Sequence, residues 1–191
     1  MRLFATFRDD RTLLRRSASF ADSLMAEPAE ADVAWLTEKA TRGDVDHARW
    51  ELRYLRRALG ILIAQRDALD DRTPSAVLRA LMDRMDRDHN VDPELRELSE
   101  RQFNARLSAY RDAFTSRGHG TPALRVAQNL LAFAGGPIRS GDPIVQRGAS
   151  LVEEALASAN AQLRATFGEA ELPEDVRPSE AAIAGVHKAK R

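Results

Sequence analysis

The stretch VDHARWELRYLRRALGILIAQRDALDDR, residues 45–72, decides the fold of this chain. Its apolar residues recur three and four positions apart, which is the period of an α-helix. They are Val45, Ala48, Leu52, Leu55, Leu59, Leu62 and Leu69, and the stripe is widened by Trp50, Tyr54, Ala58, Ile61 and Ala68. Because this apolar arc exceeds half of the helix circumference, other helices must pack against it on several sides. The stretch predicts a central helix about 40 Å long that ends before Pro74.

Further helices are predicted on both sides of this central one. Proline stands near the first turn of four segments, and the residues before it that can act as N-caps are Thr73, Asp92, Thr121 and Asp142. A fifth segment ends at Gly43, which can close a helix, and Asp44 can cap the central one. These signals predict helices at about 28–42, 74–85, 93–116, 122–134 and 143–167. No run of residues alternates as a strand would, so we expect an all-α, irregular bundle of about six helices around one long central helix.

The chain divides into three parts. Residues 1–27 contain short apolar pieces interrupted by Asp9 and Asp10, and they predict a short helix or a partly mobile segment. Residues 28–168 form the helical bundle domain. Residues 169–191 are polar, with few large apolar side chains, and we expect this tail to be disordered.

Charge and composition exclude several classes of function. The chain has 29 basic and 29 acidic residues, so it lacks the concentrated positive charge typical of nucleic-acid binding, and we do not expect nucleic acid as its partner. It contains no cysteine, which excludes disulfides, thiolate metal sites and cysteine nucleophiles. No apolar run approaches the roughly 18 residues of a membrane span, so we expect a cytoplasmic protein. Arginine far outnumbers lysine, which fits a GC-rich bacterial genome.

Three polar residues of the central helix form a candidate site. His47 and Glu51 are four positions apart and fall within the apolar arc, beside Tyr54. A polar pair in that position must find partners. One interpretation is a metal or acid–base site inside the bundle; the simpler one is a hydrogen-bonded pair near the start of the helix. A ferritin-like metal centre needs two Glu-x-x-His pairs and two more glutamates, so we predict no metal and no cofactor.

A strip of four arginines lies within about 100° on the remaining arc of the same helix. It comprises Arg49, Arg53, Arg56 and Arg57. The strip could bind an acidic partner helix, a phosphate backbone or the acidic part of the tail at 169–180. The simpler interpretation is a solvated face balanced by nearby aspartates. Arg66 and Asp70, four apart on the apolar side, predict a partly buried ion pair.

The segment DRDHNVDPELRE, residues 86–97, resembles a calcium-binding loop in its spacing of oxygen-bearing side chains. These are Asp86, Asp88, Asn90, Asp92, Glu94 and Glu97. However, Val91 stands where the sharp turn requires glycine, and Pro93 cannot donate the hydrogen bond that pairs two such loops. No second loop of this kind is present. A helix end followed by Asp92 as the next N-cap explains the segment more simply.

The sequence contains no motif of a serine hydrolase, a zinc protease, a P-loop or a dinucleotide-binding fold. We therefore predict no catalytic residue. The expected function is that of a non-enzymatic adaptor, scaffold or complex subunit that associates with a protein partner or with itself, through the central helix or the tail. The alternative is a small helical enzyme, or a ligand- or metal-binding bundle, with a site around His47, Glu51 and Tyr54.

Overall fold

All secondary structure in the described part of the chain is helical. The computed structural model describes residues 2–68, 72–117 and 119–168, with the side chains of the first helix from Asp10 onward. Its helices are α1 (Arg2–Leu24), α2 (Glu30–Lys39), α3 (Val45–Asp67), α4 (Arg72–Asp86), a 3₁₀ helix (Pro93–Leu95), α5 (Arg96–Thr115), α6 (Pro122–Ala134) and α7 (Pro143–Phe167). The prediction of an irregular all-α bundle is confirmed.

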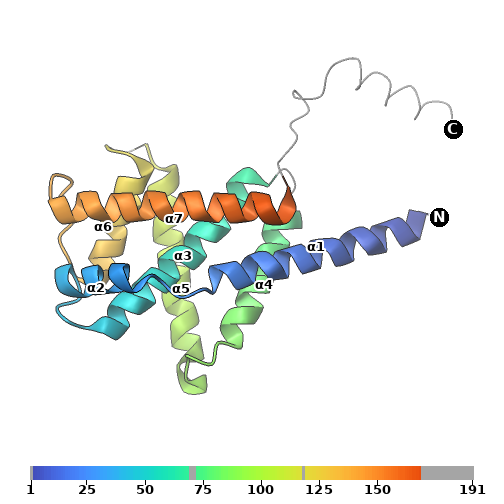
Figure 1. Cartoon of the computed structure of the whole chain (residues 1–191), viewed down its shortest axis with the longest axis horizontal. Helices are drawn as coiled ribbons and strands as arrows, with labels where there is room; N and C mark the ends of the chain where they lie inside the picture. Colours follow the sequence, from blue (N-terminus) through green and yellow to red (C-terminus); the bar gives the residue numbers. More distant parts are fainter. Residues whose placement is uncertain (1, 69–71, 118, 169–191) are drawn as a thin grey trace, which may run out of the picture.

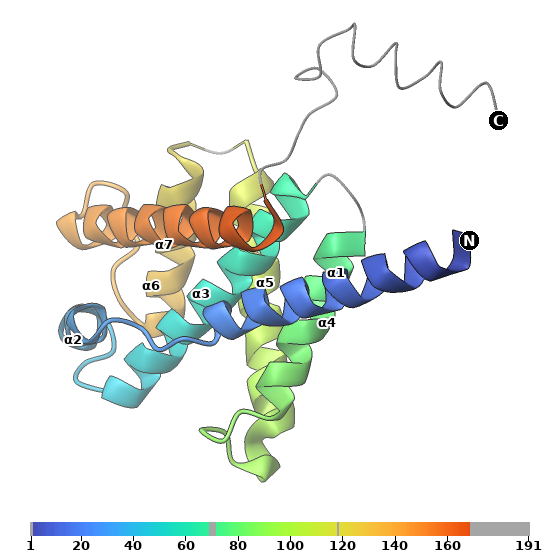
Figure 2. The same cartoon turned by 45° about the vertical axis from the view of Figure 1, so that its right-hand side comes forward.

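Helix α3 is the centre of this bundle. It contacts each of the other α-helices, and in Figures 1 and 2 it crosses the middle of the molecule between α7 and α5. Its buried residues follow one another around the whole helix from Glu51 to Ala64, with only Arg56 between them partly exposed. The wide apolar arc therefore has the effect predicted for it, because neighbours cover the helix on every side.

The region between α3 and α4 differs from the prediction. Helix α3 ends at Asp67 rather than near residue 72, and α4 begins at Arg72, before Pro74. Thr73 is therefore a buried residue of the first turn of α4 and not its N-cap. Proline is tolerated within a first turn because its missing N–H would have no helical partner there. Of the predicted Arg66–Asp70 pair, Asp70 lies outside the described residues, and Arg66 Nε instead donates to Oδ1 of the adjacent Asp67 at 2.6 Å.

The predicted N-caps hold at three helices. The side chains of Asp44, Thr121 and Asp142 accept hydrogen bonds from the backbone N–H of His47, Leu124 and Ile144, at 2.9, 3.1 and 2.8 Å. Asp92 also caps, but the helix that it opens is the 3₁₀ turn, so α5 starts at Arg96 and not at Pro93. Helix α2 ends at Lys39, earlier than Gly43 suggested. The turn into α3 is instead made by Arg42 and Gly43, both with positive φ.

The N-terminal segment forms one continuous helix, α1, which is longer than the short helix expected. The C-terminal third of α1 enters the core, where Phe20, Ala21 and Leu24 are buried. It also packs on α7, because the ring centroids of Phe20 and Phe167 lie 6.3 Å apart. Arg72 of α4 pairs with Asp10. The first half of α1 extends beyond the other described helices, as Figures 1 and 2 show.

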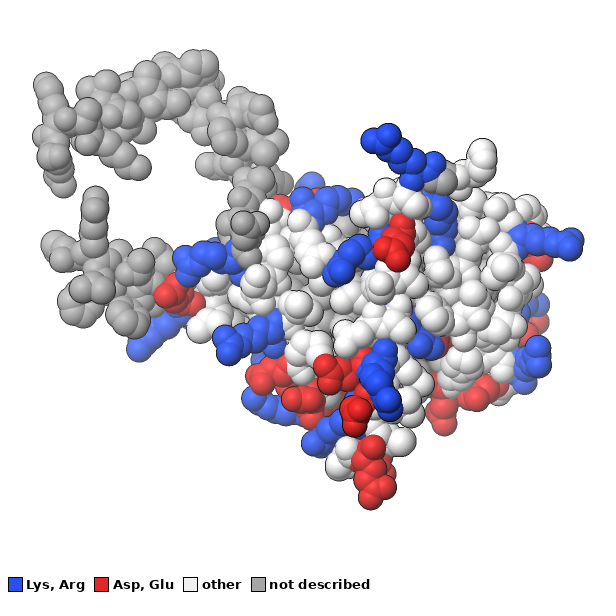
Figure 3. Space-filling model, turned by 180° about the vertical axis from the view of Figure 1, so that it is seen from behind, with Lys and Arg blue, Asp and Glu red and all other residues white. Residues whose placement is uncertain are grey.

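The surface shows no concentration of one charge sign on the face seen in Figure 3. Basic and acidic side chains alternate there, with uncharged surface between them. None of the helices in residues 2–68, 72–117 and 119–168 has the length and apolarity that a bilayer crossing requires.

A glycine in the central helix allows α1 to approach it closely. A Cβ atom added at Gly60 would lie 2.4 Å from Cδ1 and from Cδ2 of Leu24, a side chain that is 1% exposed. With α1 this close to α3, a side chain at position 60 would need the buried Leu24 side chain to shift.

We predict that Gly60→Ala lowers the free energy of unfolding by about 1–2 kcal/mol, because overpacking against Leu24 outweighs the better helix propensity of alanine. Gly141→Ala is the control, since nothing lies within 4 Å of a Cβ at that position and its φ is not positive. Urea unfolding of both variants measures the difference. A Gly60→Ala variant as stable as the wild type would show that Leu24 can move aside.

Candidate functional site

His47, Glu51 and Tyr54, the three residues predicted as a site, lie in one polar cluster. Glu51 is 1% exposed, and its two carboxylate oxygens accept hydrogen bonds from Arg106 of α5, with 3.1 Å between Nε and Oε2. His47 Nε2 lies 3.4 Å from Glu51 Oε1 and is partly exposed. The buried carboxylate thus has its counter-charge in Arg106, a residue on another helix that sequence reasoning did not find.

Aromatic rings enclose this ion pair. The Arg106 guanidinium lies over the rings of Phe133 and Tyr54, with 4.4 and 5.4 Å between its carbon and the ring centroids. The Tyr54 hydroxyl lies 3.1 Å from Ser99 Oγ and donates to Gln102 Oε1 at 3.3 Å. Cation–π contacts of this kind are stronger when water is excluded. Because Tyr54, Arg106 and Phe133 belong to α3, α5 and α6, the cluster connects these three helices.

The chemistry of this cluster is that of a stable ion pair. Burial alone would lower the pKa of Arg106, but the hydrogen bonds and charge of Glu51 outweigh burial and raise it. Burial also raises the pKa of Tyr54 and of the nearby Tyr110. In the part of the chain that the structure describes, no three His, Asp or Glu side chains are grouped as metal ligands would be. The geometry gives no support to an acid–base or metal centre at this place.

The arginine strip connects α3 to segments distant in sequence. Arg49 donates to Glu30 of α2 at 2.6 Å, and Arg53 donates to Glu27, just before α2, at 2.8 Å. The interpretation of the strip as a solvated face is wrong, because Arg53 and Arg57 are 7% and 2% exposed. Both guanidinium groups also lie over the Trp50 ring, at 4.5 and 5.7 Å from its centroid.

Arg57 binds the segment that resembled a calcium loop. Its Nη2 donates to Asp88 Oδ2 at 2.9 Å, and the two side chains are 2% and 4% exposed. Asn90 donates to Asp88 Oδ1 through its backbone N–H and its side-chain amide, at 3.0 and 2.9 Å. Burial would raise the pKa of Asp88, but these donors outweigh burial and lower it. Asp92 caps the following turn, as the simpler interpretation of residues 86–97 predicted, whereas the role of Asp88 as a buried counter-ion was not predicted.

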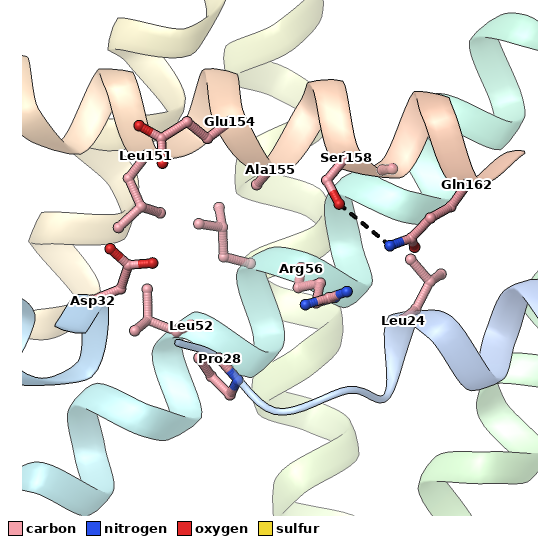
Figure 4. Close-up of a pocket in the computed structure, with 12 residues that line it drawn as sticks. Leu24, Pro28, Asp32, Leu52, Arg56, Leu151, Glu154, Ala155, Ser158 and Gln162 are labelled. Carbon is pink, nitrogen blue, oxygen red and sulfur yellow. Dashed lines mark hydrogen bonds between the residues drawn. The ribbon is translucent and has the colours of Figure 1, made fainter. Parts of the chain in front are cut away.

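Arg56 is the one member of the strip that has no partner within the described residues. It faces a cavity of about 130 Å³ between α3, α7 and the connection from α1 to α2 (Figure 4). Sequence reasoning assigned no role to α7 in a site and did not find this cavity. A cavity arises from the packing of three elements far apart in sequence, and α7 by itself shows only the apolar period of a helix.

We predict that Arg57→Met lowers the free energy of unfolding by about 3–5 kcal/mol at pH 7, because Asp88 is left buried without its counter-charge. Arg56→Met is the matched control, since it removes a charge from the same helix without breaking a pair, and its effect should stay within about 1 kcal/mol.

The pH dependence of the Arg57→Met effect provides a further check. The pKa of Asp88 is lowered in the folded wild type. The Arg57–Asp88 pair therefore stabilises the fold fully at pH values above 3.8, the ordinary pKa of an aspartate. This stabilisation is lost as the pH falls through the folded pKa of Asp88. The difference between Arg57→Met and the wild type should therefore decrease in acid. Equal losses for the two arginine variants at pH 7 would contradict the distinction between them.

We also predict that the folded protein forms no tyrosinate at the ordinary tyrosine pKa of about 10. The chain has two tyrosines, Tyr54 and Tyr110, and burial raises the pKa of both. A raised folded pKa means that their contribution to stability is complete below pH 10 and is lost as the pH rises above it. Tyrosinate absorbance should therefore appear only above pH 10 while the helical circular dichroism is intact. A reversible transition near pH 10 with the helices intact would contradict this.

Comparisons with known proteins found no relative of this chain. No protein-family model matches it, and neither the curated proteins nor the solved structures include a match. Roles for its residues therefore rest on the contacts, burial and charges of this chain itself.

Proposed function

We propose that this chain is a non-enzymatic, cytoplasmic adaptor or complex subunit that works through protein–protein association, with residues 2–15 of α1 as its contact element. One observation carries the proposal. Helix α1 extends beyond the bundle, and Leu14 on this helix is 58% exposed. In the sequence, Leu3, Phe7 and Leu14 follow one another at spacings of four and seven, which is the period of an apolar helix stripe.

The physical reason is the instability of a helix without packing. A helical segment shorter than roughly 12–15 residues is marginal in water, and most helical stability in proteins comes from burying an apolar face. The part of α1 before Asp10 has no described helix beside it in Figures 1 and 2, whereas at Asp10 the helix is held by the ion pair with Arg72 of α4. A groove on a partner would supply the missing contact, in the manner of an amphipathic helix that binds in a hydrophobic groove.

The charges beside the stripe indicate the kind of groove. Arg11 and Arg15 are exposed and lie on the neighbouring polar face of α1. An apolar groove with an acidic rim would therefore complement this helix. The two contact elements expected from the sequence are replaced by α1 in this proposal, because α3 is covered by its neighbours and the tail at 169–191 lies outside the described residues.

The test is a comparison of two leucine variants. Full-length wild type, expressed in its source cell, should purify as an oligomer or with one partner in fixed stoichiometry, as measured by light scattering. Leu14→Gln should weaken that association about tenfold or more, because a buried leucine contributes roughly 1.5–3 kcal/mol. Its thermal stability should not change, since Leu14 is exposed.

Leu98→Gln is the matched control, because Leu98 of α5 is 42% exposed at another place on the surface. It should leave association unchanged. A strictly monomeric wild type without a stoichiometric partner would contradict the proposal, and so would an equal effect of the two variants.

A further inference from the structure

The cavity beside Arg56 has the size and lining of a small-ligand site. Its volume is about 130 Å³, close to the roughly 150 Å³ of a cavity that holds benzene. Figure 4 shows it between α7 and α3, with the connection from α1 to α2 along one side. Four leucines line it, which are Leu24, Leu52, Leu55 and Leu151. These walls would suit a hydrocarbon group of a few carbon atoms.

Arg56 places in this cavity a cation that forms no ion pair within residues 2–68, 72–117 and 119–168. Burial lowers the pKa of Arg56. At Arg49 and Arg57 the carboxylates of Glu30 and Asp88 act against the effect of burial, but no described acid does so at Arg56. The guanidinium remains charged, because the ordinary pKa of arginine lies far above neutrality. An anion in the cavity would supply the missing counter-charge, and the forked donors of a guanidinium match a carboxylate.

Gln162 adds an unpartnered acceptor to the same cavity. Its Nε2 donates to Ser158 Oγ at 3.3 Å, whereas its Oε1 is buried and has no hydrogen-bond partner in the described part of the chain. In Figure 4 both residues lie on α7 at the end of the cavity where Arg56 lies. A buried acceptor without a donor is unfavourable, so a ligand hydroxyl at this end would be stabilised by Gln162.

The opposite end of the cavity carries negative charge. Asp32 of α2 and Glu154 of α7 lie there in Figure 4. They share one cation, Arg147, whose Nη2 and Nη1 lie 3.3 and 3.0 Å from their carboxylate oxygens. Two carboxylates with one guanidinium repel an anion, so a bound carboxylate would be directed towards Arg56.

We propose that this cavity binds a small aliphatic carboxylate that has a hydroxyl group on the carbon next to the carboxylate. The carboxylate accepts hydrogen bonds from Arg56, the hydroxyl donates to Gln162 Oε1, and the hydrocarbon part contacts the four leucines. The inference does not depend on association through α1, because no residue before Leu24 lines the cavity.

The experiment uses the full chain and three probes of nearly equal size. α-Hydroxyisovalerate has all three features, its amide lacks the charge, and isovalerate lacks the hydroxyl. Calorimetric titration should give a dissociation constant of roughly 1 mM or tighter for α-hydroxyisovalerate, as expected for a ligand of this size. The amide should bind about tenfold more weakly or worse, and isovalerate should bind several-fold more weakly.

Two arginine variants separate recognition from folding. Arg56→Gln should remove the preference for the carboxylate over the amide, and its thermal stability should not fall, because Arg56 forms no ion pair with another described residue. Arg79→Gln changes an exposed arginine of α4 outside the cavity and should keep the preference. Two outcomes would overturn the proposal, namely no binding to the wild type at several times 1 mM or an Arg56→Gln variant that retains the preference. Leu14→Gln should bind the probes as the wild type does. Failure of the association test would therefore not affect the test of ligand binding.

Discussion

The burial of α3 on all sides is the constraint on which the rest of the structure depends. A helix whose apolar arc exceeds half of its circumference can be covered only if several helices surround it, and α3 contacts each of the other described α-helices. Its charged residues are then enclosed together with the apolar ones. Glu51 must find Arg106, and Arg57 must find Asp88, because an unpaired buried charge is strongly unfavourable. Covering α3 thus determines where α5 and the loop after α4 can lie.

The helices were predictable where local signals agree with one another. At Thr121 and Asp142 a capping side chain precedes a proline and an apolar period begins, and both helices start there. The prediction was wrong where two signals compete. At Thr73 the residue before a proline was expected to cap, but the first turn of α4 tolerates Pro74 and begins at Arg72. The full length of α1 was missed because acidic residues interrupt its short apolar pieces.

The partners of the polar residues were less accessible to sequence reasoning. His47, Glu51 and Tyr54 are grouped as their helical spacing indicates, but nothing in α3 identifies Arg106, which is 55 positions away. One usable signal existed, since Arg106 stands between Phe103 and Tyr110 on the buried side of α5. Arg56 is the reverse case. By its spacing Arg56 was predicted to be equivalent to the other three arginines of the strip. Those three have carboxylate partners, whereas Arg56 faces the cavity beside α7.

The contact between Gly60 and Leu24 also links the volumes of two positions far apart in the chain. The branched end of Leu24 occupies the space that a side chain at position 60 would need. Among chains that share this fold, a larger residue at the position of Gly60 should therefore occur with a smaller one at that of Leu24. Such compensating exchanges would indicate that α1 packs on the central helix in the same way, even where the surrounding sequence has diverged.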